Sequence, residues 1–311
     1  MRKTSWRVAQ AVGGAIILYF LVQKTRADWA KVQEQRIVWH LRWEFIIAAL
    51  IVTWAMYGVL IWGWRAVLAG WGERLRIVDA ARIWSISSLG KYIPGKIWSI
   101  AGMAMMAQQR GVSATAATGS AVIMQLVSLA TGAMLALALS GTDLLNRLAG
   151  GFGATAAIVL ASLALVMAIG LTSPSVTRRI GFVLGRPEAI RPVDPSALAA
   201  ALFANLVAWA GYGISLQLLL LGTLQGIDLP WTTATGGFAA SYVLGYVFLF
   251  IPAGFGIRDL ALFMLLRDTI GDAPALAIAA ASRVALTINE VGVALPFLLF
   301  RRKPSDIILP V

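Results

Sequence analysis

The sequence contains no cysteine and a single histidine, His40. The lack of cysteine excludes disulfides, thiolate metal sites, iron–sulfur clusters and cysteine nucleophiles, and one histidine cannot supply a multi-histidine metal site. Charge is also scarce, because only 13% of the residues are Asp, Glu, Lys or Arg whereas 59% are hydrophobic. No class of soluble globular protein has this balance, so the chain is predicted to be an integral membrane protein.

Long charge-free runs support this prediction. Several of them reach about 20 residues, which as helix is enough to cross roughly 30 Å of hydrocarbon. Lipid offers no hydrogen-bond partners and the runs lack the alternation of barrel strands, so they are predicted to be helices and the fold class to be all-α. We expect six spans, the first an uncleaved anchor rather than a signal peptide, near residues 8–23, 45–64, 114–140, 152–172, 197–223 and 275–300.

The first of two broken segments covers residues 77–110. Lys91, Lys96 and the Pro94-Gly95 turn divide it into arms that are too short to cross a membrane, so it is predicted to be a re-entrant hairpin. A proline-broken turn frees backbone N–H groups at a helix start, and two neighbouring lysines favour an anionic headgroup there. The alternative is a cytoplasmic loop with ordinary positive-inside lysines.

The second broken segment covers residues 232–270 and contains an irregular turn followed at once by an Arg-Asp pair. A charge near the membrane midplane costs roughly 2.5–3.5 kcal/mol, so it is retained mainly where a cavity or a partner receives it. At the interface, the same pair would merely cap a helix. If this segment crosses the membrane twice, the protein has eight spans instead of six spans and two hairpins. The turn and the charges are Pro252, Gly254, Gly256, Arg258 and Asp259.

Two charges, Arg283 and Glu290, interrupt the last apolar run. Their spacing of seven residues puts them on nearly the same helix face about 10 Å apart, so each is expected to meet a group from another segment. Asp259 is one candidate partner for Arg283. Such contacts can be structural ion pairs or substrate contacts. Gln125, isolated in another apolar run, can join two helices by a hydrogen bond or belong to the same polar path.

The two halves of the chain follow one plan in opposite orientations. Residues 45–140 and 197–300 each place a broken hairpin between two spans, and an isolated polar residue, Gln125 or Arg283, follows 31 residues after the proline of each break. Transporters use inverted repeats of this kind. We therefore predict a single transmembrane domain over residues 1–311 with half-repeats at 45–140 and 197–300.

The distribution of lysine and arginine predicts the orientation. With the N-terminus inside, the cytoplasmic loops carry 17 of these residues and the outer loops carry six, so both termini are predicted to be cytoplasmic in a bacterial inner membrane. Trp29, Trp39 and Trp43 indicate that residues 24–44 lie as a helix in the interface. The net charge of +12 is spread over the gaps between apolar runs, which favours an anionic lipid surface over nucleic acid as the partner.

Three segments of the sequence are distinctive: Ser88 to Ser99, Arg110 to Ser113 and Ile251 to Asp259. They resemble the two signature regions of the lysylphosphatidylglycerol synthase transmembrane region family, whose members are also described as flippase-like domain proteins. The resemblance covers about residues 10–300. The chain differs from the family at two positions, because the family often has Glu where this chain has Asp259, and often an acidic residue where it has Gln125.

The resemblance implies a lipid translocase fold in which the broken segments line a cavity for a headgroup. In fused members, a cytoplasmic synthase domain aminoacylates phosphatidylglycerol and the membrane part flips the product. We expect that domain to be absent here, because eleven residues follow Phe300. Stand-alone relatives are associated with other lipids, including polyprenyl-linked sugars and hopanoid pathways, so the substrate does not follow from the fold.

The leading hypothesis is a flippase, without cofactor or metal, that moves a phospholipid, an aminoacylated phospholipid or a polyprenyl-phosphate-linked lipid. The rival functions are a membrane-embedded lipid-modifying transferase and a small-anion transporter, and a homo-oligomer or a partner lipid-synthesis enzyme is left open. The expected headgroup site is Lys91, Tyr92, Pro94, Gly95, Lys96, Trp98 and Arg258. The expected polar path is Gln125, Asp259, Arg283 and Glu290, and the expected hairpin breaks are Pro94, Pro252, Gly254 and Gly256.

Overall fold

The computed structural model describes residues 40–93, 97–142, 145–146, 151–183, 191–247 and 256–299. Over these residues the fold is all-helical, as predicted. Five helices are long and apolar enough to cross a membrane, and they coincide with five of the six predicted spans. They are α2 (Trp43–Ala69), α5 (Ala114–Ser140), α7 (Gly153–Gly170), α9 (Pro195–Thr223) and α12 (Asp272–Leu299). The predicted first span, residues 8–23, lies outside the described residues. The same is true of most of the predicted interfacial helix, residues 24–44, of which only the last residues are described, and Trp43 among them begins α2.

The two broken segments form two pairs of short helices. The first pair is α3 (Ile77–Ser88) and α4 (Ile97–Gln108), joined through the 3-10 helix η1 (Leu89–Tyr92), and the second is α10 (Trp231–Val247) and α11 (Ile257–Ile270). In each pair the two helices pack on one another as a hairpin. The four helices have 12 to 17 residues, so they are about 18–26 Å long and shorter than the roughly 30 Å hydrocarbon core.

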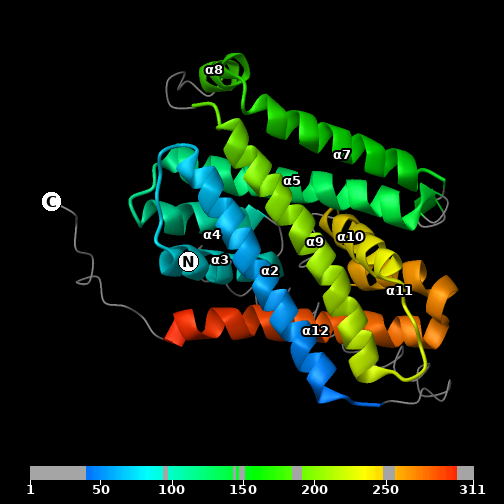
Figure 1. Ribbon diagram of the computed structural model, residues 1–311. Coiled ribbons are helices and arrows are strands. Elements are labelled where there is room, and N and C mark those ends of the chain that lie inside the picture. Colours follow the sequence, from blue (N-terminus) through cyan, green and yellow to red (C-terminus); the bar gives the residue numbers. More distant parts are fainter. Residues whose placement is uncertain are drawn as a thin grey trace, which may run out of the picture.

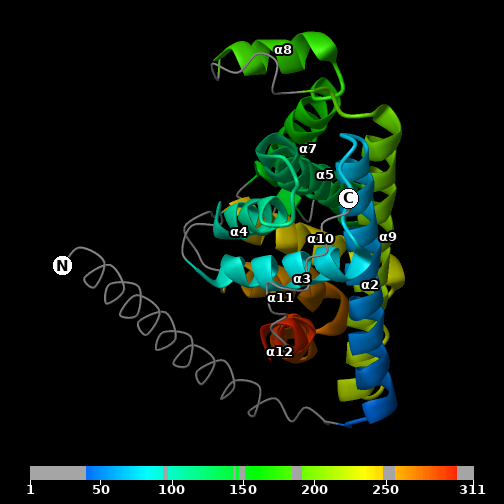
Figure 2. The same cartoon turned by 90° about the vertical axis from the view of Figure 1, so that its left-hand side faces the viewer.

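The helices are arranged in two layers (Figure 1). α2 and α9 pack side by side along their length and lie in front of the other helices. Seen from the side, α7, α5, the two hairpins and α12 are stacked behind them in that order (Figure 2). α5 contacts α4 and α10, whereas α12 contacts α3 and α11. Both hairpins are therefore enclosed between α5 and α12 and covered on one face by α2 and α9.

Small residues allow α2 and α9 to approach closely. A Cβ atom on Gly63 would lie 2.6 Å from the Cβ of Ala204, and one on Gly70 would lie 2.8 Å from the Cβ of Ala197. Lipid chains are as apolar as the helices, so close van der Waals contact of this kind, rather than the hydrophobic effect, holds membrane helices together. The tightly packed pair of α2 and α9 supports the two hairpins that lie behind it.

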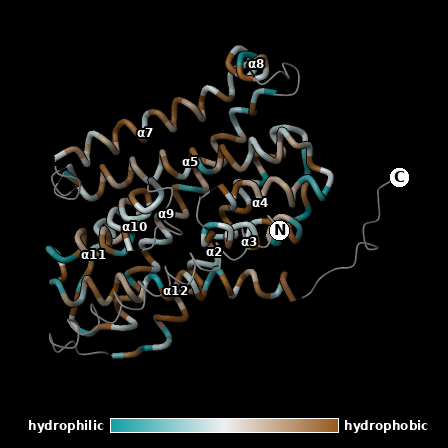
Figure 3. Tube along the Cα trace, turned by 180° about the vertical axis from the view of Figure 1, so that it is seen from behind, coloured by the Kyte–Doolittle hydropathy of each residue, from teal (hydrophilic) through white to brown (hydrophobic). Residues whose placement is uncertain are grey.

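The outward faces of the bundle carry large apolar side chains. Val159, Leu163 and Val166 of α7 are 59%, 56% and 66% exposed. Hydrophobic residues run along the long helices, and the hydrophilic ones gather mainly at their ends (Figure 3). An exposed apolar surface of this extent is suited to lipid contact. The chain is therefore a multi-pass membrane protein.

An ion network closes the open end of the first hairpin. Asp79, at the start of α3, pairs with Arg76 at 2.8 Å and also with Arg110, which follows α4. Asp79 is buried, so both partners offset the cost of removing its carboxylate from water. The network fixes the two ends of the hairpin beside each other.

One helix was not expected from the sequence. α8 (Pro174–Val183) follows α7 and projects from the end of the stack, as Figure 2 shows. Its first four residues belong to a charge-free run that continues from α7 in the sequence, so hydropathy alone did not separate the two helices.

Candidate functional site

The two hairpins meet at a cavity of about 210 Å³. Its wall includes residues near the middle of four long helices: Tyr57 of α2, Gln125 of α5, Ala208 of α9 and Leu286 of α12. The middle of a spanning helix lies near the midplane of the bilayer. The cavity is therefore placed deep inside the membrane protein, between its two short hairpins.

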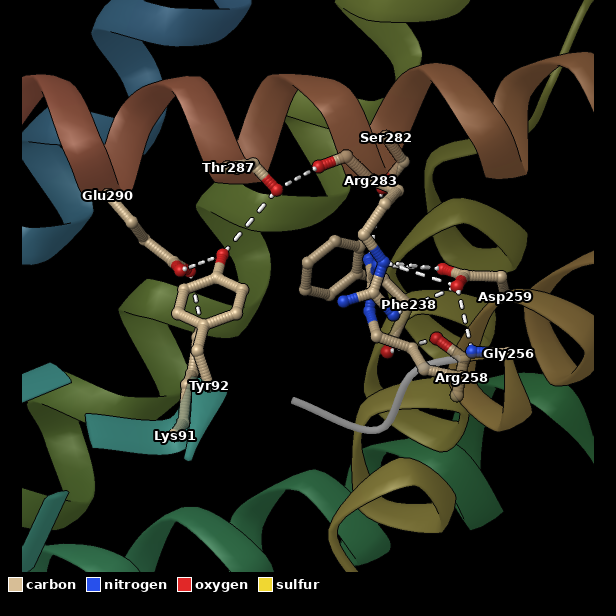
Figure 4. A network of polar contacts seen from close by, with 11 residues as sticks. Lys91, Tyr92, Phe238, Gly256, Arg258, Asp259, Ser282, Arg283, Thr287 and Glu290 are labelled. Atoms are coloured by element: carbon tan, nitrogen blue, oxygen red, sulfur yellow. Dashed lines mark hydrogen bonds and ion pairs between the residues drawn. The ribbon is translucent and has the colours of Figure 1, made fainter. Parts of the chain in front are cut away.

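A first polar cluster joins the first hairpin to α12 (Figure 4). Glu290, which is 5% exposed, accepts hydrogen bonds from the Lys91 ammonium group and from the Tyr92 hydroxyl, the latter at 2.7 Å. The Tyr57 hydroxyl lies 3.5 Å from the same carboxylate, and the Tyr92 hydroxyl lies 3.4 Å from the Thr287 hydroxyl. A buried carboxylate is thus supplied with one cation and two hydroxyl groups, which offsets the cost of its burial.

A second polar cluster joins the second hairpin to α12. The guanidinium of Arg283 donates to Asp259 through Nε, at 3.1 Å from both carboxylate oxygens, and through Nη2 at 2.9 Å. This forked contact is the geometry in which arginine binds a carboxylate most strongly. Asp259, which the sequence offered as one candidate partner for Arg283, forms this ion pair in the structure. Asp259 also accepts the backbone N–H of Gly256 at 3.3 Å and so caps the start of α11.

The third cation, Arg258, is 3% exposed and has weaker partners. Its Nη1 lies 3.4 Å from Asp259, its Nη2 donates to the Ser282 hydroxyl at 3.0 Å, and its Cζ lies 4.9 Å from the ring centroid of Phe238. Within the described part of the chain, its buried Nε has no hydrogen-bond partner. Figure 4 shows the Arg258 and Arg283 guanidinium groups close together beside the Phe238 ring.

Gly90 explains how the first hairpin presents its polar residues. A Cβ at this position would lie 2.8 Å from the backbone nitrogen of Ser99 and 2.9 Å from the carbonyl carbon of Trp98. Only glycine therefore lets η1 pack this tightly on the first turn of α4. The next two residues, Lys91 and Tyr92, are then held beside Glu290.

Aromatic side chains make up much of the remaining wall. Trp209 forms edge contacts with Tyr212, Phe238 and Tyr242, with ring centroids 6.0, 6.4 and 5.3 Å away. Five of the six tyrosines in the sequence line the cavity: Tyr57, Tyr92, Tyr212, Tyr242 and Tyr246. Sequence reasoning missed all of these except Tyr92. The sequence did offer a sign of them, since each places a hydroxyl group in an apolar run and a buried tyrosine usually requires a polar partner.

The predicted site residues divide into three groups. Those that line the cavity are Lys91, Tyr92, Gln125, Arg258, Arg283 and Glu290. Trp98 and Asp259 are not part of its wall: Trp98 is 40% exposed on α4, and Asp259 reaches the site through Arg283. The remaining predicted residues lie outside the part of the chain that the structure describes, except for Gly256, which directly precedes α11. These residues are Pro94, Gly95, Lys96, Pro252 and Gly254.

Comparison with known protein families identifies one that covers most of the chain. A family model described as the lysylphosphatidylglycerol synthase TM region matches residues 7–289. No curated protein matches the chain.

Proposed function

The chain belongs to the lysylphosphatidylglycerol synthase TM region family, and we propose that it is a flippase that moves a lipid between the leaflets of a bacterial inner membrane. We also propose that both of its termini lie in the cytoplasm. The family gives a lipid-related role at the membrane. The observation that carries the proposal is the cavity between the two hairpins, which lies beside the middle of four long helices and is lined by charged residues.

The cost of burying charge supports a ligand in this cavity. Each charge at the membrane centre costs roughly 2.5–3.5 kcal/mol on insertion scales, and ion pairs recover this cost only when their geometry is good. Five charges gather here: Lys91, Arg258, Asp259, Arg283 and Glu290. A bundle that needed only stability would be served as well by apolar residues, so we propose that these charges receive a lipid headgroup while its acyl chains stay in the bilayer.

The pattern of helix contacts supports an inverted repeat as part of this proposal. α2, α3, α4 and α5 would correspond to α9, α10, α11 and α12. α4 packs on α5 as α11 packs on α12, and α10 packs on α5 as α3 packs on α12. In such repeats the binding site lies at the interface of the halves, and rocking of one half against the other gives alternating access. We propose that the two hairpins open the cavity to opposite sides of the membrane.

We propose no catalytic step. A lipid-modifying transferase needs a general base that can accept a proton. The two carboxylates at the site, Asp259 and Glu290, are each bound to a cation. A translocase needs no such base, because it forms and breaks no covalent bond.

Reconstitution tests the proposal against both rival functions. The full chain would be placed in liposomes with a fluorescent phosphatidylglycerol, and transfer between leaflets would be followed with an impermeant quencher. Liposomes with the Arg258→Gln variant, and liposomes without protein, serve as controls. We expect protein-dependent transfer with no chemical change in the lipid. Modification of the lipid would favour a transferase, and ion current without lipid transfer would favour a small-anion transporter.

A further inference from the structure

We propose that the transported lipid has one net negative charge, on a phosphodiester whose remaining headgroup is uncharged and carries hydroxyl groups, and that Arg258 binds the phosphate. The inference rests on the proposed translocase function and narrows its substrate. It separates anionic lipids from zwitterionic and aminoacylated lipids, which also carry a phosphate.

The sum of charges at the site is the first observation. Three cations, Lys91, Arg258 and Arg283, meet two carboxylates, Asp259 and Glu290. Among these five residues, one positive charge is therefore in excess. An unbalanced charge deep in a membrane protein is unfavourable, and a ligand of opposite charge removes the imbalance. A lipid with one negative charge would make the occupied site neutral.

The pairing of the carboxylates is the second observation. Glu290 already accepts from the Lys91 ammonium and the Tyr92 hydroxyl. Asp259 is held by Arg283 through three contacts of 2.9 to 3.1 Å. A headgroup ammonium would have to displace one of these cations to reach a carboxylate, and otherwise it would meet an excess of positive charge. The site is therefore unfavourable for a lipid whose headgroup ends in an amine.

The position of Arg258 is the third observation. Because Arg283 occupies both oxygens of Asp259, the contact of 3.4 Å from Arg258 to that carboxylate is the weaker one. The Arg258 side chain lines the cavity, and its buried Nε has no partner among the described residues. Arg258 also lies in the first turn of α11, where the helix dipole adds positive potential. A guanidinium at a helix start is well suited to a phosphate, because its fork can donate two hydrogen bonds.

Uncharged polar side chains make up another part of the cavity wall. Gln125, Ser128, Tyr212 and Tyr246 line the cavity without adding charge. Hydroxyl and amide groups both donate and accept hydrogen bonds, so they can bind the hydroxyls of a glycerol or a sugar. The aromatic faces of Trp209 and Tyr242 can pack against the apolar C–H surface of the same headgroup. These groups favour a neutral hydroxylated headgroup behind the phosphate.

Binding to the purified full chain tests this specificity without requiring transport. Native mass spectrometry would compare phosphatidylglycerol, phosphatidylcholine and lysylphosphatidylglycerol, which carry net charges of about −1, 0 and +1. We expect phosphatidylglycerol to bind at least about tenfold more tightly than the other two, and Arg258→Gln to lower its affinity about tenfold to a hundredfold, since a charge-assisted hydrogen bond contributes about 1.5–3 kcal/mol. Equal or tighter binding of lysylphosphatidylglycerol would overturn the proposal.

A second variant, which adds a negative charge, tests the proposal independently in case Arg258→Gln does not fold. Gln125→Glu places a carboxylate in the cavity wall and balances the site, so it should abolish the preference for phosphatidylglycerol over phosphatidylcholine. Gln108→Glu is the matched control, because Gln108 is exposed at the end of α4 and should leave the preference unchanged. Unchanged preference in Gln125→Glu would contradict the charge-balance argument.

The water-soluble headgroup glycerophosphoglycerol distinguishes a lipid from a free phosphodiester. We expect it to compete weakly, because it lacks the acyl chains that hold a lipid beside the cavity. If it binds as tightly as phosphatidylglycerol, the assignment to a lipid is overturned. If selective lipid binding is found but transfer between leaflets is absent, the translocase function fails while the specificity of the site stands.

Discussion

Lys91 and Glu290 lie 199 residues apart in the sequence and form an ion pair in the centre of the helix bundle. This pair fastens the first hairpin to α12. The pair between Asp259 and Arg283 fastens the second hairpin to the same helix, seven residues earlier. α12 therefore holds both hairpins through two charges on one face, and movement of either hairpin requires one ion pair to open.

The first prediction concerns the Lys91–Glu290 pair. Lys91→Met leaves a buried carboxylate without its cation, so we expect it to reduce stability by about 3–5 kcal/mol. The double variant Lys91→Met/Glu290→Gln removes both charges and should regain most of that loss. Melting temperatures of the two single variants and the double variant measure the coupling. Additive losses of stability would show that the two side chains do not interact.

The second prediction concerns Arg283. Arg283→Ala should lower stability by about 1–3 kcal/mol, between the values for exposed and fully buried pairs, because Asp259 retains the Gly256 N–H and a contact with Arg258. Arg283→Lys should restore only part of this stability, since an ammonium group lacks the planar fork that binds both oxygens. Thermal unfolding of both variants and of the unchanged protein measures the order of their stabilities. Full recovery in Arg283→Lys would mean that the forked geometry contributes nothing.

Much of the fold could be predicted from the sequence, because the bilayer fixes the length of a spanning helix. Charge-free runs predicted α2, α5, α7 and α9, and an apolar run interrupted by Arg283 and Glu290 predicted α12. Proline and glycine marked the breaks within residues 77–110 and 232–270, and each of these segments forms a pair of short helices. In contrast, α8 continues an apolar run and was not predicted as a separate helix.

The candidate site was less predictable, because it is assembled from segments far apart in the chain. The spacing of Arg283 and Glu290 showed that each needs a partner elsewhere, but local spacing does not identify Lys91 as the partner of Glu290. Tyr212, Tyr242 and most of the other cavity tyrosines were missed, because an aromatic residue in an apolar run resembles ordinary core or lipid-facing sequence. Their convergence depends on how α9 and α10 pack, which hydropathy does not show.

A third prediction concerns the backbone of the first hairpin. Gly90→Ala places a methyl group 2.8 Å from a backbone nitrogen that cannot move aside, so we expect a loss of about 1–3 kcal/mol and reduced lipid transfer. Gly58→Ala is the matched control, because nothing lies within 4 Å of the new Cβ and alanine favours the helix. Unfolding of both purified variants measures the difference. Equal stability of the two variants would contradict the close approach of η1 to α4.

A fourth prediction concerns topology. The chain has no cysteine, so single introduced cysteines report on one position each. Ser88→Cys, in the cavity wall, should react slowly with impermeant maleimides from either side. Gln108→Cys should react quickly from the cytoplasmic side and Asp228→Cys quickly from the opposite side. Both residues are exposed, Gln108 at the end of α4 and Asp228 in the connection between α9 and α10. Labelling of Ser88→Cys from the cytoplasm as fast as that of Gln108→Cys would contradict the position of Ser88 in a cavity deep in the helix bundle.

Blocking the cavity with a bulky label would show whether the lipid headgroup passes through it. In liposomes containing Ser88→Cys, a bulky membrane-permeant maleimide such as N-(1-pyrenyl)maleimide would fill part of the cavity that Ser88 lines, and the extent of labelling would be read by mass spectrometry. We expect labelled Ser88→Cys to lose protein-dependent transfer of fluorescent phosphatidylglycerol, whereas equally labelled Gln108→Cys should keep it. Undiminished transfer in fully labelled Ser88→Cys would contradict passage of the headgroup through this cavity.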